Sequence, residues 1–246
     1  DASRLIQIGD ADVMIAGGSE AAVTPLCIGA FMTMKALSTR NDEPTRASRP
    51  FDKDRDGFVL AEGAGMYVLE SEEHAKARGA TIYAELTGTG NSCDASHITA
   101  PNAEGRGACN SMKWALEDAG LTTDDINYIN AHGTSTPLGD KAEVYAVQQV
   151  FGARSKPGND LVMNSTKSMH GHCLGASGAV ELIACIGAIN ESLVPPTINI
   201  DNLDDGFDQI DIVANQPREM SVKHVMNNTF GFGGHNVTLI CSKYEG

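Results

Sequence analysis

Short apolar runs typical of buried strands alternate along the chain with segments of helical periodicity, and this alternation constrains the fold more than any other feature. The strand-like runs occupy residues 11–16, 57–71, 81–89, 126–131 and 161–165, and further strands are expected near 210–213, 223–228 and 236–242. Strands that alternate with helices predict an α/β fold built in layers.

Helices are expected between these strands. Ser71 can cap a short helix, and a longer helix ends at Gly120. Asp140 and Glu143 resemble a capping arrangement for a helix that runs to residue 151, and another helix is expected from about 177 to 190. The loop at 91–106 is long and rich in turn residues, so it is the expected domain boundary and a candidate for a mobile lid.

Composition limits the class of protein. A chain of 246 residues with 41% hydrophobic content can bury one large core or two modest ones, so a soluble globular protein is expected. A net charge of −14 argues against a nucleic-acid partner, because phosphates require a basic surface. The longest apolar run in the C-terminal half, residues 182–189, is too short to cross a bilayer, so no membrane association is expected.

The N-terminal segment and the spacing of the cysteines bear on the cellular compartment in which the protein works. The N-terminal segment has neither a basic region nor an apolar core, so it does not resemble a secretory or transit segment. The six cysteines stand at least 12 positions apart, which excludes a CxxC pair and fits a reducing environment. We therefore expect a cytoplasmic protein, with the plastid stroma as the alternative.

Basic residues are concentrated in one segment of this acidic chain. Six of the 18 lysines and arginines fall between Lys35 and Arg55. A local basic patch suits an acidic partner. Acidic residues are interleaved with them, however, so a solvated loop with both signs of charge is the alternative.

Two histidines and a lysine follow predicted strands. His132 comes directly after the strand at 126–131, while Lys167 and His172 follow the strand at 161–165. In α/β proteins the carboxyl ends of strands are where ligands bind, although a single histidine there is usually structural. Two neutral rings can each donate an Nε2 hydrogen bond to a developing oxyanion, and a nearby lysine keeps them neutral by lowering their pKa.

Two further segments have residues suited to a ligand. Thr134 and Thr136 alternate as on an extended segment, so both hydroxyls can face an amide, although a locally bonded turn is the alternative. Phe230 and Phe232 lie in a glycine-rich turn between two strands. They can gate an apolar pocket, or the segment is a plain hairpin.

Nucleotide and metal sites are not expected. No glycine cluster is followed by the lysine and hydroxyl residue of a phosphate-binding loop. The segment at 52–57 begins like a calcium loop but has Gly63 at the twelfth position, and His170 and His172 lack a third ligand.

Seven motifs resemble those of the β-ketoacyl-acyl carrier protein synthases, in the elongating class that has a Cys-His-His triad. The similarity runs from Asp1 to about Tyr244, in the order of the family's own motifs. The motifs are GDADVMIAGGSE, ALSTRND, SRPFDKDRDGFVLAEGAG, NAHGTSTPLGD, KSMHGHCLGASGAVE, VPPTIN and NTFGFGGHN.

The resemblance implies a thiolase-like layered α-β-α-β-α sandwich that forms homodimers. Residues 1–90 would be the end of the first thiolase-like half, and residues 91–246 would be the complete second half. The nucleophilic cysteine of the family would lie just upstream of Asp1, at the N-terminus of a helix. None of the six cysteines in this chain stands in the nucleophile motif.

Site residues can be assigned through the resemblance. His132 and His172 match the two triad histidines, and Lys167 and Glu181 match the lysine and the acidic residue that support them. His170 departs from the family's usual small residue or threonine. The remaining matches are Thr134 and Thr136 for the pantetheine arm, Phe230 and its neighbour Phe232 for the gate, Asp94 and His97 for a mobile loop, and Lys35 for carrier-protein docking.

The resemblance implies decarboxylative Claisen condensation of an acyl thioester with malonyl-acyl carrier protein in fatty-acid elongation. The partner would be acyl carrier protein with acyl and malonyl groups on phosphopantetheine, and no cofactor would be needed. The alternative is a non-catalytic subunit of the same fold, such as a chain-length factor or scaffold. The residue at the nucleophile position would distinguish the two.

Overall fold

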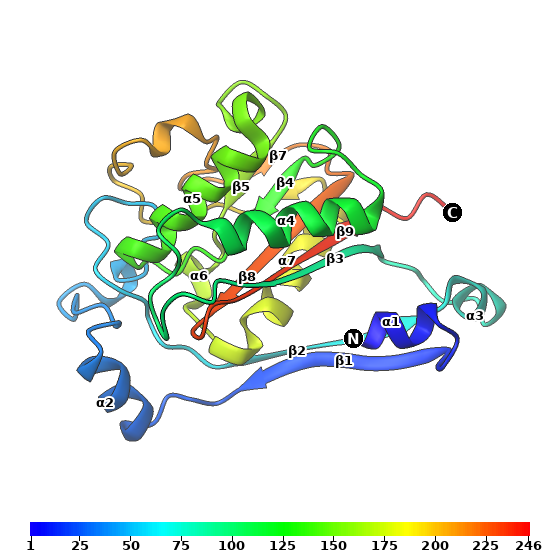
Figure 1. The fold of residues 1–246 in the computed structure, drawn as a ribbon, viewed down its shortest axis with the longest axis horizontal. Helices are drawn as coiled ribbons and strands as arrows, with labels where there is room; N and C mark the ends of the chain where they lie inside the picture. Colours follow the sequence, from blue (N-terminus) through cyan, green and yellow to red (C-terminus); the bar gives the residue numbers. More distant parts are fainter.

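The computed structural model describes all 246 residues, and its centre is a five-stranded sheet (Figure 1). The strand order is β3-β9-β8-β4-β5, in which β4 is parallel to β5 and β8 while β9 is antiparallel to β3 and β8. The strands are β3 (Glu85–Cys93), β4 (Tyr128–Asn130), β5 (Val162–Asn164), β8 (His224–Gly231) and β9 (His235–Ser242).

Helices and a second, smaller sheet form layers on both sides of this sheet. On one side lie α4 (Arg106–Ala119) and α5 (Pro137–Phe151). On the other side α7 (Ser177–Glu191) lies between the sheet and an antiparallel ribbon of β1 (Val13–Glu20) and β2 (Gly63–Glu70), as Figure 1 shows. The layered α/β fold expected from the sequence is confirmed.

The remaining elements are short. They are the helices α1 (Ala2–Gln7), α2 (Pro25–Thr33), α3 (Glu72–Ala77) and α6 (Lys167–His170), the strands β6 (Leu193–Val194) and β7 (Arg218–Glu219), and the 3-10 turns Pro44–Arg46, Gly152–Ser155, Leu174–Ala176 and Phe207–Gln209. Ser71 caps α3 as predicted, because its hydroxyl accepts a hydrogen bond from the His74 backbone amide.

The five-stranded sheet separates two apolar cores. Successive residues of a strand point to opposite faces, so each strand supplies both cores. Ile129, Met163 and Met226 pack toward α4 and α5. Their preceding neighbours Tyr128, Val162 and Val225 pack with the α7 residues Leu182, Cys185 and Ile189. A sheet covered on both faces explains why its strands have nearly continuous apolar sequences.

Glycines let helices approach the strands closely. A Cβ atom at Gly90 in β3 would lie 1.9 Å from the Ser111 carbonyl oxygen in α4. A Cβ atom at Gly65 in β2 would lie 2.8 Å from the Ala179 carbonyl oxygen in α7. At these positions the helix backbone therefore packs directly against the strand backbone, and a side chain on the strand would clash.

The outer face of the β1 and β2 ribbon is apolar and exposed within this chain. Inward and outward residues alternate along β1, as expected for a strand. Ile15, Met66 and Val68 on the outer face are 60 to 70% exposed. An apolar face of this kind is typical of a surface that another part of a protein covers.

α7 and the turn before it, Leu174–Glu191, are long and apolar enough to cross a membrane by length and composition alone. In this structure the segment is a core helix instead. It packs on β8, β1 and β2, and Glu181 in its middle is fully buried in an ion pair.

Three local expectations differ from the structure. Residues 210–213 form only isolated bridges, such as Ile212 to Met163, rather than a strand. α5 begins at Pro137 with Thr136 at its N-cap, so Asp140 and Glu143 are not capping residues. α2 and α6 were not predicted.

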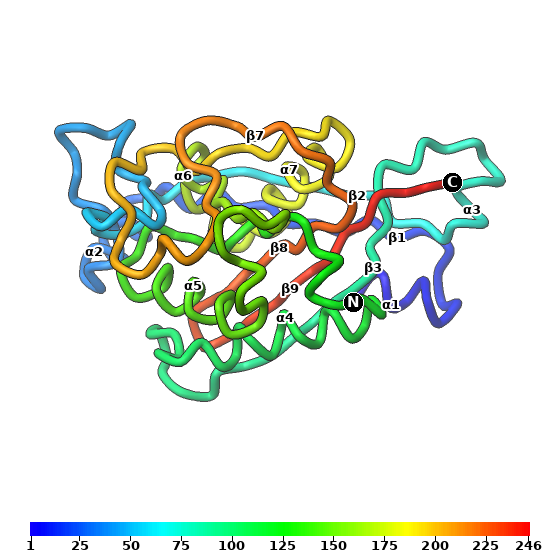
Figure 2. Tube along the Cα trace, turned by 90° about the horizontal axis from the view of Figure 1, so that it is seen from above, coloured from blue at the N-terminus to red at the C-terminus, as the bar shows by residue number.

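The segments at 44–57 and 199–210, far apart in sequence, lie side by side at one end of the molecule (Figure 2). The Lys53 amide donates to the Asn202 carbonyl at 2.9 Å, and the Asp204 amide donates to the Phe51 carbonyl at 3.0 Å. Both segments lie beside the N-terminus of α5, where Asp140 accepts a hydrogen bond from the Phe51 amide.

Candidate functional site

The two predicted histidines lie next to each other in the structure. β4 and β5 are parallel neighbours, so the segments that follow them begin at the same edge of the sheet. His132 follows β4, and His172 follows β5 and α6. Their ring centroids are 5.3 Å apart and the rings are nearly perpendicular, at 83°.

A hydrogen bond orients the His172 ring, whereas Nδ1 of His132 is buried without a hydrogen-bond partner in this chain. His172 Nδ1 is 2.8 Å from the Ser177 hydroxyl, and its Nε2 makes no hydrogen bond within the chain. Phe58 packs edge-on against the His172 ring at 5.1 Å. Phe230 lies 5.7 Å from the His132 ring. The two imidazoles are therefore held between aromatic rings, with His172 Nε2 available to a ligand.

Lys167 and Glu181 form a buried ion pair behind the histidines. Their side chains are 1% and 0% exposed. Lys167 begins α6 and Glu181 lies on α7, so the pair joins the two elements that flank His172. Burial raises the pKa of Glu181 to about 7, although the Lys167 ammonium acts in the opposite direction.

Both histidine rings are neutral at neutral pH. Burial lowers the pKa of His172 to about 3, and the positive charge of Lys167 adds to the effect. The pKa of His132 is lowered well below its usual value by the same two causes, in the same order. Neutral rings near one another can both donate N–H groups to one oxygen that gains negative charge.

Glu143, whose spacing predicted a helix cap, instead bonds the backbone that follows β4. Its carboxylate accepts hydrogen bonds from the backbone amides of His132 at 2.9 Å and Gly133 at 2.8 Å, and from the Asn228 side chain at 3.2 Å. Burial raises the pKa of Glu143 to about 7. The sequence did hold a sign of this role. Glu143 is an acidic residue between Ala142 and Ala146, which lie on the buried side of the helix, and a charged residue there needs a partner.

Thr134 and Thr136 come together, but not on an extended segment. Their hydroxyl oxygens are 2.9 Å apart. Ser135 between them has a left-handed backbone, with φ of +70°. The two hydroxyls therefore lie on one side because the chain turns at Ser135, which corrects the expected extended geometry.

The glycine-rich turn after Phe230 contacts the loop at 94–105. The Asp94 amide donates to the Gly234 carbonyl at 2.8 Å, and the Gly233 amide donates to the Ile98 carbonyl at 2.7 Å. The Asp94 carboxylate also accepts a hydrogen bond from the Asn236 side chain at 2.8 Å. The turn and the loop thus form one unit beside His132.

Three other predicted residues lie farther from the histidines. The His97 ring caps its own loop by accepting from the amides of Thr99 at 3.1 Å and Ala100 at 3.0 Å. Phe232 is 49% exposed and lies 6.4 Å from Phe31 in α2. Lys35 follows α2, is exposed, and takes part in no ion pair.

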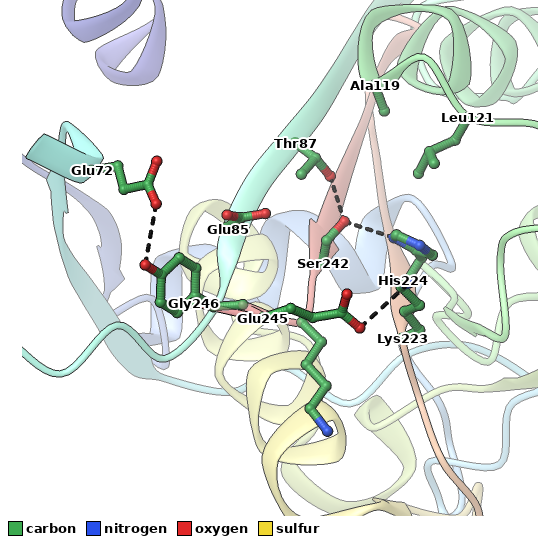
Figure 3. Close-up of a pocket in the computed structure, with 12 residues that line it drawn as sticks. Glu72, Glu85, Thr87, Ala119, Leu121, Lys223, His224, Ser242, Glu245 and Gly246 are labelled. Atoms are coloured by element: carbon green, nitrogen blue, oxygen red, sulfur yellow. Dashed lines mark hydrogen bonds and ion pairs between the residues drawn. The ribbon is translucent and has the colours of Figure 1, made fainter.

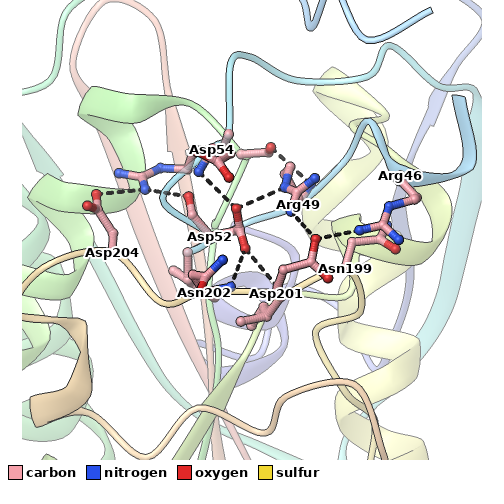
Figure 4. Close-up of polar contacts among 12 residues, drawn as sticks. Arg46, Arg49, Asp52, Asp54, Asn199, Asp201, Asn202 and Asp204 are labelled. Carbon is pink, nitrogen blue, oxygen red and sulfur yellow. Dashed lines mark hydrogen bonds and ion pairs between the residues drawn. The ribbon is translucent and has the colours of Figure 1, made fainter. Parts of the chain in front are cut away.

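Two of the six basic residues in this segment, Arg49 and Arg55, are buried. Arg49 forms ion pairs with Asp52 and Asp201, and Arg55 forms ion pairs with Asp140 and Asp204. Figure 4 shows Arg49 and Asp52 beside Asp201, where they connect the segment at 46–55 to the segment at 199–204. The sequence did not anticipate these buried ion pairs: Arg49 and Arg55 stabilise the fold, whereas Lys35 is exposed and docking there stays a prediction.

A separate polar cavity of about 410 Å³ lies at the opposite ends of β8 and β9 (Figure 3). The His224 ring Nδ1 is 2.7 Å from the Ser242 hydroxyl, which is 2.8 Å from the Thr87 hydroxyl. Tyr244 donates to Glu72 at 3.1 Å, which ties the last residues to α3. None of the predicted site residues lines this cavity.

Comparison with known sequences matches two adjoining family models. The N-terminal domain of β-ketoacyl synthases matches residues 1–75, and the C-terminal domain matches residues 83–201. The 3-oxoacyl-[acyl-carrier-protein] synthase 2 of Synechocystis is 53% identical over 100% of this chain and 58% of its own length. The chloroplastic synthase I of Arabidopsis thaliana is 48% identical over 99% of this chain and 50% of its own length.

Solved structures agree with these matches. A ketosynthase in complex with its acyl-carrier protein, from a type II polyketide system, superposes with a TM-score of 0.94 at 39% identity, over 99% of this chain and 59% of that one. A β-ketoacyl synthase from Burkholderia phymatum superposes with a TM-score of 0.93 at 42% identity, over 99% of this chain and 58% of that one. The chain thus spans little more than half the length of its relatives, has their thiolase-like layered fold, and belongs to the β-ketoacyl synthase family.

Proposed function

We propose that the complete protein containing this chain catalyses the decarboxylative Claisen condensation of an acyl thioester with malonyl-acyl carrier protein in fatty-acid elongation. The observation that carries the proposal is the pair of neutral histidine rings, 5.3 Å apart, beside the buried Lys167–Glu181 ion pair and with Glu143 bonded to the His132 backbone amide. The names of the curated relatives favour this activity over a non-catalytic subunit.

The two histidines act on the malonyl group. Nε2 of His132 and of His172 donates hydrogen bonds to the malonyl thioester oxygen. The bond from C2 to the carboxylate breaks, carbon dioxide leaves, and the electron pair forms an enolate whose oxygen the rings stabilise. C2 then attacks the carbonyl of the acyl thioester, and the enzyme's thiolate leaves as the new carbon–carbon bond forms.

The nucleophilic cysteine is assigned to the segment upstream of Asp1. Removal of a proton from a thiol is favoured at a helix N-terminus, and α1 at Ala2–Gln7 continues such a helix in this assignment. No cofactor or metal is needed for these steps. The exposed outer face of β1 and β2 is then a surface that the rest of the first thiolase-like half covers.

The remaining assignments follow from the same proposal. Residues 1–90 belong to the first half and residues 91–246 form the second, with β3 crossing the junction. Thr134 and Thr136 bond the pantetheine arm, Phe230 and Phe232 gate the acyl pocket, and Asp94 and His97 belong to a loop that moves with the gate. The complete protein is a homodimer that works in the cytoplasm or the plastid stroma, and acyl carrier protein docks near Lys35.

The test is malonyl decarboxylation by the complete polypeptide. His132→Ala and His172→Ala are each expected to lower the rate about 100-fold to 1,000-fold, the usual effect of removing one oxyanion donor. His224→Ala, a histidine at the far end of β8, is the matched control and is expected to retain the rate. Full activity in either site variant would overturn the proposed roles.

The chain-length-factor alternative has its own test. Sequencing the residues just upstream of Asp1 in the complete polypeptide identifies the residue at the nucleophile position. A cysteine there supports the condensing enzyme, whereas a glutamine supports the non-catalytic subunit.

A further inference from the structure

Ser135 has an unusual backbone at the centre of the segment that bears the two threonines. Its φ of +70° lies in the left-handed region, where a residue with a Cβ atom is strained. Ser135 is also fully buried. A strained backbone persists only where the surrounding structure holds it in place, and such residues cluster at functional sites.

Every polar group of Ser135 is bonded to another part of the chain. Its amide donates to Asp140 Oδ1 at 3.1 Å, and its hydroxyl accepts from the Arg49 amide at 3.0 Å. Its carbonyl accepts from the Gly57 amide at 3.0 Å. Two of these three partners come from the segment at 46–57, so that segment determines the conformation of Ser135.

The partners of Ser135 are themselves fixed by buried charges. Arg49 pairs with Asp52 at 3.0 Å, and both side chains are at most 2% exposed (Figure 4). Arg55 lies 3.3 Å from Asp140 and donates to the Thr136 carbonyl at 3.2 Å. The buried ion pairs therefore fix the groups that bond to residues 135 and 136: the Arg49 amide and Asp140 bond to Ser135, and Arg55 bonds to the Thr136 carbonyl.

The conformation of Ser135 places the two threonine hydroxyls together. In an extended chain, residues 134 and 136 would be separated by about 7 Å along the strand. With Ser135 turned, the two hydroxyl oxygens are 2.9 Å apart. They lie beside Gly139, where a Cβ atom would come within 2.5 Å of the Thr136 hydroxyl, so only a glycine leaves room for them.

We propose that Ser135 is a positioning residue for the substrate arm: its left-handed conformation, held by the segment at 46–57, sets Thr134 and Thr136 to bind one amide of the pantetheine together. The inference rests on the proposed function and extends it from the two threonines to the residue between them. Ser135 itself makes no contact with substrate in this assignment, because it is fully buried.

The test compares two malonyl thioesters as substrates for decarboxylation by the complete polypeptide. Malonyl-pantetheine has the amides that the threonines bind, whereas the malonyl thioester of ethanethiol has none. Ser135→Ala removes the hydroxyl that bonds the strained backbone to the Arg49 amide, so the left-handed conformation is less populated and KM for malonyl-pantetheine is expected to rise about threefold to tenfold. The kcat for malonyl-pantetheine and the rate with the ethanethiol thioester are expected to stay within about twofold of the wild type.

Ser135→Gly separates the backbone from the hydroxyl. Glycine adopts φ of +70° without strain, so this variant keeps the turn and loses only the bond from the Arg49 amide. Its KM for malonyl-pantetheine is expected to lie between those of the wild type and Ser135→Ala.

The outcomes distinguish the two proposals. If Ser135→Ala lowers the rate with both thioesters equally, or changes neither, Ser135 has no positioning role and this inference is overturned. If the wild-type polypeptide decarboxylates neither thioester, the proposed function fails and this inference fails with it.

Discussion

At the scale of single residues, Lys167 has two separable effects. Its charge helps to keep His132 and His172 neutral, and it pairs with the buried Glu181. We expect Lys167→Met to raise the pKa of both histidines, because a positive neighbour disfavours the imidazolium form. Burial remains the larger cause, so the acid limb of the pH profile for decarboxylation is expected to move up from near pH 3 while staying below pH 6.5. The measurement is the decarboxylation rate between about pH 2 and 8, a range that includes the acid limb of both the wild type and the variant.

The same substitution leaves Glu181 buried without its partner, which typically destabilises a fold by about 3 to 5 kcal/mol. The double variant Lys167→Met with Glu181→Gln removes that carboxylate. It is therefore expected to recover part of the lost stability in urea while keeping the shifted acid limb. An acid limb that returns to the wild-type position in the double variant would show that Lys167 acts on the histidines through Glu181 rather than through its charge.

Secondary-structure elements with a clear period could be predicted from the sequence, whereas those defined by distant contacts could not. The runs at 126–131 and 161–165 contain the short strands β4 and β5, so the sequence correctly placed His132 and His172 after strands, and these strands prove to be parallel neighbours. α2 was missed because its sequence is apolar throughout and none of its residues is buried in this chain. A helix without a polar face gives no periodic signal.

Acidic residues in α5 show a second limit. Asp140 and Glu143 have the spacing of a helix cap, but they accept hydrogen bonds from backbone amides of Phe51, Ser135, His132 and Gly133. The same two residue types at the same spacing serve both purposes, and only the tertiary structure separates them. The left-handed backbone of Ser135 could not be predicted from the sequence either. It depends on partners at least 78 positions away in the segment at 46–57 as well as on nearby Asp140.

The contact between β3 and α4 leads to a prediction for these elements. Gly90→Ala would place a methyl group 1.9 Å from the Ser111 carbonyl oxygen, which is backbone and cannot rotate away. We expect the variant to lose about 1 to 3 kcal/mol of unfolding free energy, the usual cost of overpacking. Urea denaturation measures the loss. Gly187→Ala in α7 is the control, because no atom beyond the adjoining backbone of its own helix lies within 4 Å of the added methyl group, and it is expected to be neutral or stabilising by up to about 1 kcal/mol. Equal midpoints for the two variants would contradict the close packing of β3 and α4.

At the scale of the whole molecule, the charge at the proposed docking surface near Lys35 is opposite in sign to the net charge of the chain. The chain has a net charge of −14, so an acidic carrier protein is repelled by most of it. Arg49 and Arg55 are buried in ion pairs and cannot attract a partner, whereas Lys35 is exposed and unpaired. We therefore expect Lys35→Glu in the complete polypeptide to weaken binding of acyl carrier protein about tenfold at low salt and to reduce the dependence of affinity on ionic strength. Lys243→Glu changes the net charge by the same amount at the far end of β9, and it is expected to leave both quantities nearly unchanged. Equal losses in the two variants would show that overall charge, rather than a docking surface near α2, controls the encounter.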